Sequence, residues 1–253
     1  MDIMELFVII LAGFFSAVIK NGVGVGSGIF LLPVLSLVFP AKIALGLGGP
    51  IMLGSDLIGL RNYWCEWLER KQLFRLMAAA VPGLIVGTLL IPVIPGHIFR
   101  AGVGIFGMCY SVCLLFPAIP RAVFPPRRPA AEITEASRNR SAIFYGMLGG
   151  VATVLAHAGG LVWSIYLLST DADRRTFVGT LVIMFAATNL YKTLAYLQIG
   201  ILSLPMLGMA LMALPGIWLG AQVGNYCNRK INRELFRKAV LVVIFIVSAL
   251  LLR

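Results

Sequence analysis

Charged residues are scarce in this chain of 253 residues: aspartate, glutamate, lysine and arginine together make up 12% of it. A soluble globular domain carries about twice that fraction. Hydrophobic residues make up 60%, and apolar runs long enough to cross a bilayer recur from Leu6 to Leu252. The composition leaves no room for a separate soluble domain. It predicts an all-α polytopic membrane protein.

Motifs of metal and covalent catalysis are also lacking. The four cysteines form no CxxC pair and no zinc spacing. The sequence contains no HExxH, no GxSxG and no paired acidic motif for prenyl transfer. We therefore expect no enzymatic activity, no cofactor and no bound metal.

Negative charge is scarcer than positive charge, and the formal net charge is +11. Such an excess is typical of nucleic-acid binding, but here the basic residues lie in short loops between apolar runs. When successive loops are assigned to opposite sides of the membrane, most of the 21 basic residues fall on one side. We expect no nucleic-acid partner. We predict a multi-pass protein of the inner membrane, with basic loops in the cytoplasm and both termini periplasmic or extracellular.

The sequence resembles itself at an offset of 133 residues. This shift places Gly13 on Gly146 and Gly26 on Gly159. It also places Ser55-Asp56 on Thr188-Asn189, and Pro82-Gly83 on Pro215-Gly216. One ungapped offset for all these pairs indicates an internal duplication.

Each copy holds five apolar pieces, and an odd number inverts the second copy in the membrane. We predict two inverted-topology repeats, residues 1–117 and 141–253, joined by a basic cytoplasmic linker at 118–140. Each repeat opens with a Gly-broken helix, either re-entrant or discontinuous. The whole chain would have about 8–10 membrane segments.

The stretch NGVGVGSGIFLLPVL, residues 21–35, places four glycines in an apolar run. Each costs about 1 kcal/mol against alanine in a helix interior. A helix broken inside the membrane leaves backbone N–H groups that hydrocarbon cannot satisfy. The positive end of a half-helix that starts near Gly26 or Gly28 would favour an anion. The second copy has an equivalent break at AHAGGLVW, residues 156–163. The alternative is that the glycines only allow close helix packing through GxxxG patterns.

A few polar residues accompany the breaks, and an ionisable group at membrane depth is a candidate for function. The candidates for substrate binding are Gly22, Gly24, Gly26, Ser27, Gly28, Lys20, Asn21, His157, Gly159, Gly160, Asn189 and Lys192. The candidates for carrying protons are Asp56 and His157.

Each polar candidate also has a structural alternative. Lys192 lies near the outer end of its span and could extend its amine to the membrane surface. Asp56 could be only an ion-pair partner for Lys20 or Lys192. His157 could only cap a helix break, and Asn189 could only hydrogen-bond between helices.

The ordered set of motifs resembles the TauE/SafE sulfite-exporter family over nearly the whole chain. The set comprises GVGVGSGIFLLPVL, the basic-aromatic turn LIGLRNYW, and VPGLIVG with its echo LPGIWLG. From the resemblance we carry over the loop glycines with Pro33 and, more weakly, Gly159 and Gly160. Val25 and Ser27 interrupt the family's glycine run, and Tyr166 stands at the counterpart of Pro33.

The resemblance implies secondary transport of small sulfur-containing anions, such as sulfite or organosulfonates, across the inner membrane. We expect proton-coupled export. A passive small-anion channel on the same fold is the main alternative, and a purely structural membrane subunit is another. The expected partners are the small anion and the lipid bilayer, and a homodimer is left open as the oligomeric state.

Overall fold

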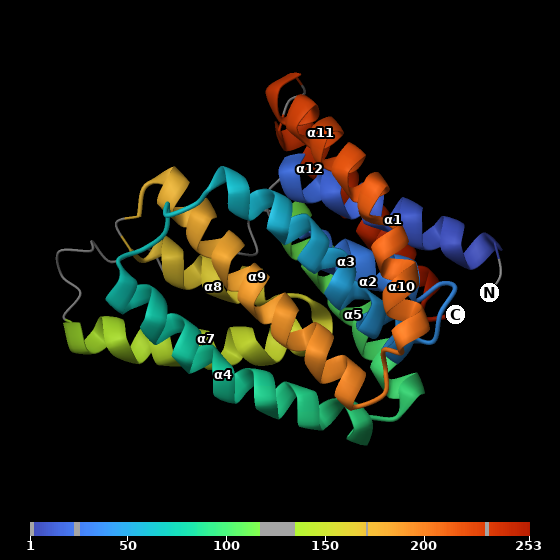
Figure 1. The fold of residues 1–253 in the computed structure, drawn as a ribbon, viewed down its shortest axis with the longest axis horizontal. Helices are drawn as coiled ribbons and strands as arrows, with labels where there is room; N and C mark the ends of the chain where they lie inside the picture. Colours follow the sequence, from blue (N-terminus) through green and yellow to red (C-terminus); the bar gives the residue numbers. More distant parts are fainter. Residues whose placement is uncertain (1–2, 23–25, 117–134, 171, 231–232) are drawn as a thin grey trace.

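The computed structural model describes residues 3–22, 26–116, 135–170, 172–230 and 233–253. These residues form helices and no strand, which confirms the all-α prediction (Figure 1). The helices are α1 (Ile3–Gly22), α2 (Ser27–Leu35), α3 (Ala41–Asn62), α4 (Arg70–Val93), α5 (Gly96–Leu115), α7 (Glu135–Ala156), α8 (Gly159–Leu168), α9 (Arg174–Gln198), α10 (Leu204–Met212), α11 (Leu214–Lys230) and α12 (Arg233–Leu250).

Several helices have the length and composition of membrane spans. Five described helices qualify individually, namely α1, α3, α4, α5 and α9. The pair α10 and α11 qualifies together, with a bend of 41° between its parts. By contrast, α2 has 9 residues and α8 has 10. At about 1.5 Å per residue, each reaches only about half of a 30 Å hydrocarbon core. The predicted 8–10 segments can be reached only by counting such shorter helices.

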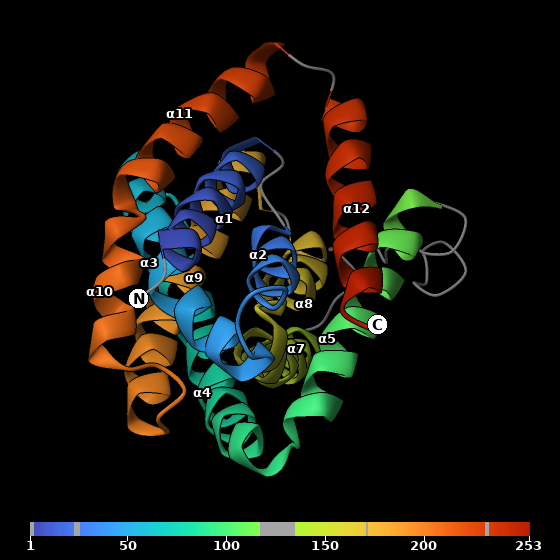
Figure 2. The ribbon, with the colours of Figure 1, turned by 90° about the vertical axis from the view of Figure 1, so that its right-hand side faces the viewer.

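The two short helices lie at the centre of the molecule. In Figure 2, α2 and α8 are surrounded by α1, α3, α7 and α9, and an outer layer is formed by α4, α5, α10, α11 and α12. Two long antiparallel packings flank this centre, α4 against α7 and α1 against α11. A half-helix in this position is covered by protein, which removes its unpaired backbone groups from lipid.

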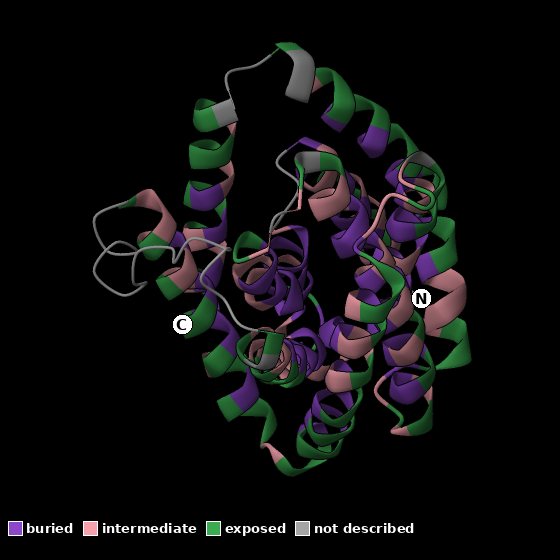
Figure 3. Cartoon of the chain, turned by 90° about the vertical axis from the view of Figure 1, so that its left-hand side faces the viewer, coloured by how far each residue is buried: buried purple, intermediate pink, exposed green. Residues whose placement is uncertain are grey.

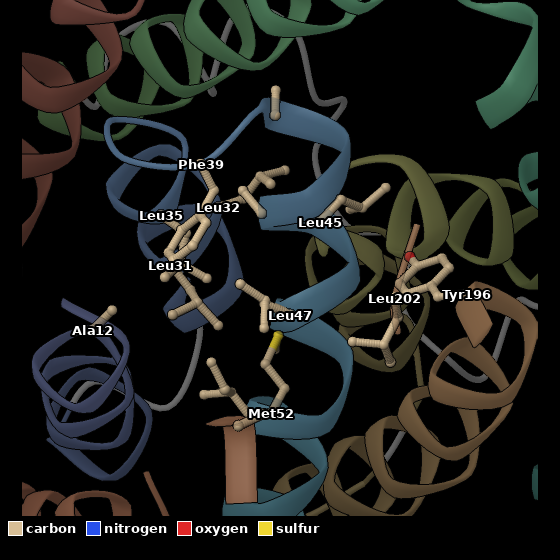
Figure 4. Packing of buried hydrophobic residues seen from close by; sticks show 14 of the residues in the cluster. Ala12, Leu31, Leu32, Leu35, Phe39, Leu45, Leu47, Met52, Tyr196 and Leu202 are labelled. Atoms are coloured by element: carbon tan, nitrogen blue, oxygen red, sulfur yellow. The ribbon is translucent and has the colours of Figure 1, made fainter. Parts of the chain in front are cut away.

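Apolar side chains pack inside the bundle and also cover its outside. Leu31 and Leu35 of α2 meet Leu45 and Leu47 of α3 in the central cluster (Figure 4). Figure 3 shows the buried residues on the inner faces and the exposed ones on the outer faces. Many of the exposed side chains are themselves large and apolar, as in Phe74. An apolar outer face is what a protein solvated by lipid requires.

The observed helix bounds follow the offset of the sequence. A shift of 133 residues carries α1 to 136–155, α2 to 160–168 and α3 to 174–195, which are close to the bounds of α7, α8 and α9. Helix α4 falls on α10 and α11 together.

The region between the two halves is described only in part. The helix α7 begins at Glu135, so the last residues assigned to the linker, 135–140, are helical. Residues 117–134 lie outside the described part of the chain.

Candidate functional site

The first helix break lies where the sequence placed it. Helix α1 ends at Gly22 and α2 begins at Ser27, while 23–25, which include Gly24, lie outside the described residues. The backbone of Gly26 has a φ of 97°, in the left-handed region. A Cβ there would also come within 2.9 Å of the Tyr110 hydroxyl. Glycine is therefore required at this position by conformation as well as by space.

The second break is shorter and meets the first. Helix α7 ends at Ala156 and α8 begins at Gly159. Between them, His157 has a φ of 51°, which is uncommon for a residue other than glycine. A Cβ on Gly28 of α2 would lie 2.6 Å from both the carbonyl oxygen and the Cβ of His157. The start of α2 therefore packs directly on the turn of the other half.

Three other predicted glycines serve close packing. A Cβ on Gly22 would lie 2.5 Å from the Phe236 ring, and one on Gly159 would lie 2.6 Å from the Cβ of Thr153. A Cβ on Gly160 would overlap the ring of Phe185. The packing interpretation accounts for these three, whereas Gly26 also has a backbone requirement.

A small cavity lies between the two breaks. Its volume, measured as the space open to the centre of a water molecule, is about 10 Å³, roughly enough for one water. Its lining comes from both halves: Gly26, Ser27, Gly28, Ile29 and Met52 from the first, and His157, Ala158, Gly160, Leu161 and Phe185 from the second. The offset of 133 relates Ser27 to Gly160, Gly28 to Leu161 and Met52 to Phe185. The cavity thus lies between corresponding surfaces of the two halves.

Two helix N-termini open toward this cavity. Helix α2 has Gly26 as its N-cap and α8 has Ala158, and neither cap residue supplies a side-chain hydrogen bond. The first N–H groups of a helix lack partners within the helix and carry a partial positive charge. Two such ends at one cavity favour an anion.

A buried ion pair lies beside the cavity. The Nζ of Lys20, in the last turn of α1, pairs with Oδ1 of Asp56 on α3. The Nδ2 of Asn189 on α9 donates to Oδ2 of the same carboxylate at 2.5 Å. Lys20 also lies 5.6 Å from the centroid of the Phe185 ring, which lines the cavity. Of the two expected partners for Asp56, the structure places Lys20 in the ion pair.

Lys192 is fully buried, so the prediction that it reaches the membrane surface is wrong. Its Nζ lies 3.2 Å from both the carbonyl oxygen and the Oγ1 of Thr153, and 2.7 Å from Nδ1 of His157. The other ring nitrogen of His157, Nε2, lies 3.2 Å from the carbonyl oxygen of Leu45. Because a carbonyl only accepts, Nε2 carries the proton and Nδ1 accepts from Lys192. His157 is thereby fixed as the neutral Nε2–H tautomer.

Two side-chain oxygens near the ion pair have no hydrogen-bond partner among the described residues. They are Oδ1 of Asn189 and Oγ of Ser55, the neighbour of Asp56. Buried polar atoms without partners are uncommon and are typical of sites that take up water or a ligand. Asn21, by contrast, donates from Nδ2 to the carbonyl oxygen of Ala17 within its own helix at 2.9 Å.

Sequence reasoning missed several residues that complete the site. Thr153 binds Lys192, and Met52 and Phe185 line the cavity. The offset could have found them, because Thr153 is the counterpart of Lys20, and Met52 and Phe185 are counterparts of each other. The carbonyl of Leu45 could not be found from sequence, because any residue supplies that group.

The comparisons with known proteins give a family and nothing finer. The family described as Sulfite exporter TauE/SafE matches residues 9–251, nearly the whole chain. No curated protein and no solved structure matches the chain. The apolar helices make it a multi-pass membrane protein, and the match over both halves agrees with the motifs found in sequence. The chain belongs to the TauE/SafE sulfite exporter family.

Proposed function

We propose that this chain is a secondary transporter that exports small sulfur-containing anions, such as sulfite or organosulfonates, in a proton-coupled cycle. One observation carries the proposal: two helix breaks, one from each half, meet at a single buried cavity. The family match supports a sulfur anion as substrate. The uncapped N-termini of α2 and α8 would bind its oxygen atoms through Ser27, Gly28 and Gly160.

The buried charges favour an anion as well. Two lysines, Lys20 and Lys192, lie beside the cavity, and Asp56 is the one buried carboxylate among the described residues. Each lysine is one side chain away from the lining. Lys20 lies over Phe185, and Lys192 contacts His157. Counting His157 as neutral, the site has an excess of positive charge that a bound anion would balance.

We further propose that residues 1–117 and 141–253 are inverted repeats, with the binding site on their pseudo-two-fold axis. The packing supports this interpretation. In a two-fold arrangement, if α1 contacts α11, then the counterpart of α1 must contact the counterpart of α11. Those counterparts are α7 and α4, and they pack together. The corresponding helices α3 and α9 also pack on each other, and Asp56 bonds its own counterpart, Asn189.

The small volume of the cavity supports alternating access over a channel. A cavity of about 10 Å³ has room for one water and none for sulfite. A passive channel would need a wider continuous path in its conducting state. We propose that this conformation is occluded and that the two halves rock about the axis to open the cavity to one side at a time. The inner membrane, cytoplasmic basic loops and external termini complete the proposal.

The test is transport by purified protein in liposomes on a solid support. Jumps of sulfite, sulfoacetate, taurine, sulfate and chloride are applied with and without a pH gradient, and currents are recorded together with tracer flux. The proposal predicts saturable flux of at least one sulfur anion that changes with the pH gradient. Flux that stays linear with concentration and ignores the pH gradient would identify a passive channel. Absence of both current and tracer flux for every sulfur anion would overturn the assignment.

A further inference from the structure

We propose that Lys192 is the group that takes up and releases the coupled proton, so that one proton accompanies each monoanion and the cycle is electroneutral. The inference rests on the proposed transport function and deepens it. The sequence alone favoured Asp56 and His157 for this role. The geometry points instead to the one buried cation whose hydrogen-bond partners are all neutral.

The first argument concerns partners. Lys20 is neutralised by direct contact with the Asp56 carboxylate. The partners of Lys192 are the carbonyl and hydroxyl of Thr153 and the imidazole of His157, all uncharged. A fully buried ammonium without an anionic partner is strongly disfavoured, so either the amine loses its proton or an anion comes to it.

The second argument concerns hydrogen-bond capacity. A protonated amine has three donors, and three acceptors face the Nζ of Lys192 at 2.7–3.2 Å. The carbonyl of Thr153, in the last turn of α7, also accepts from the amide of His157. The site can therefore hold the ammonium once its charge is balanced. The neutral amine loses only one donated bond.

The third argument concerns the alternatives. Asp56 receives hydrogen bonds from both Lys20 and Asn189, and these hold it as a carboxylate. His157 donates from Nε2 to Leu45 and accepts at Nδ1 from Lys192, so a second ring proton would remove the bond to the ammonium. The other titratable groups near Lys192 on α9 are phenols, and Tyr196 donates its hydroxyl proton to the carbonyl of Val154.

The cycle then balances in atoms and charge. In the empty carrier, Lys192 is a neutral amine beside the neutral His157. When a monoanion enters the cavity, the amine takes a proton from water and a new N–H bond forms. The anion and the ammonium move together as a neutral pair. On the other side the anion leaves, the N–H bond breaks, and the proton passes to water before the empty carrier returns.

The experiment separates exchange from net transport. Lys192→Arg keeps the positive charge but cannot release a proton, because guanidinium stays protonated. We expect this variant to exchange labelled sulfonate for unlabelled sulfonate within a few-fold of the wild-type rate. Its net flux driven by a pH gradient should fall by about a hundredfold or more, because the empty carrier must return with an unbalanced buried charge. Lys42→Arg, at an exposed lysine that bonds the carbonyl of Pro92, is the matched control and should keep both activities.

A proton count on the wild type tests the inference even if Lys192→Arg fails to fold. Methanesulfonate, which stays a monoanion, is added to detergent-solubilised protein in weak buffer. The expected result is uptake of about one proton per bound anion, lost in a folded Lys192→Arg. Binding without proton uptake by the wild type would overturn the inference. So would uptake, or pH-driven net flux, that survives in Lys192→Arg, which would return the role to Asp56 or His157. Wild-type protein that exchanges no sulfur anion would instead overturn the proposed function.

Discussion

The ion pair between Lys20 and Asp56 allows a quantitative prediction about stability. Asp56 is fully buried and the side chain of Lys20 is 10% exposed. Removing one partner of a buried pair costs about 3–5 kcal/mol, because the other charge is left uncompensated. Asp56→Asn keeps the shape and can still bond Asn189, and Lys20 retains some access to water. We therefore expect Asp56→Asn to lower the free energy of unfolding by about 3 kcal/mol, the low end of this range.

The double variant Lys20→Met/Asp56→Asn provides the control. Without the lysine no charge is left unpaired, and replacing both members of a buried pair is often nearly neutral. The free energy of unfolding should return to within about 1 kcal/mol of the wild type. The assay is equilibrium unfolding by sodium dodecyl sulfate in mixed micelles, followed by helix content. A single variant as stable as the wild type, or a double variant no more stable than the single one, would refute the reasoning.

Three further predictions concern backbone, packing and pH. Gly26→Val should abolish anion flux while the protein still inserts, because valine is strained at this φ; normal flux by well-folded protein would exclude the loop from transport. Gly48→Ala places a methyl group against the imidazole of His157, so tracer flux should fall while Gly102→Ala, which meets nothing within 4 Å, retains it. Hydrogen bonds from Thr176 lower the pKa of Asp173, the N-cap of α9, below its usual 3.8. Its stabilising effect is therefore present above that value and lost as pH falls through the lowered pKa, so Asp173→Ala should lower the melting temperature near neutral pH but not in strong acid.

The sequence predicted the architecture well because its signals are local or repeated. The apolar runs predicted helices, and the offset of 133 residues predicted which helices correspond. Glycine spacing placed the start of a half-helix near Gly26 or Gly28, and α2 begins at Ser27. Each of these features depends on composition along the chain rather than on which side of a helix faces inward.

The side-chain partners were harder to predict, because they depend on how each helix is rotated about its axis. Helices that are apolar on all sides give little indication of their inward face. Position along α9 suggested that Lys192 reaches the surface, whereas rotation of the helix directs it to Thr153 and His157. The contact of Gly28 with His157 joins residues of different halves, and nothing in either local sequence specifies it. The choice of Lys20 over Lys192 as the partner of Asp56 has the same origin.

The central claim is that the anion binds between the two helix breaks, and a structure with a bound heavy analogue of the substrate tests it most directly. Selenite replaces sulfur by selenium and can be located by its anomalous scattering. The account predicts one site per chain in the central cavity, enlarged from its present volume, with selenite oxygens bonded to N–H groups at the starts of α2 and α8. A protein that transports selenite but binds it only at the basic loops, with the central cavity still closed and empty, would contradict the account.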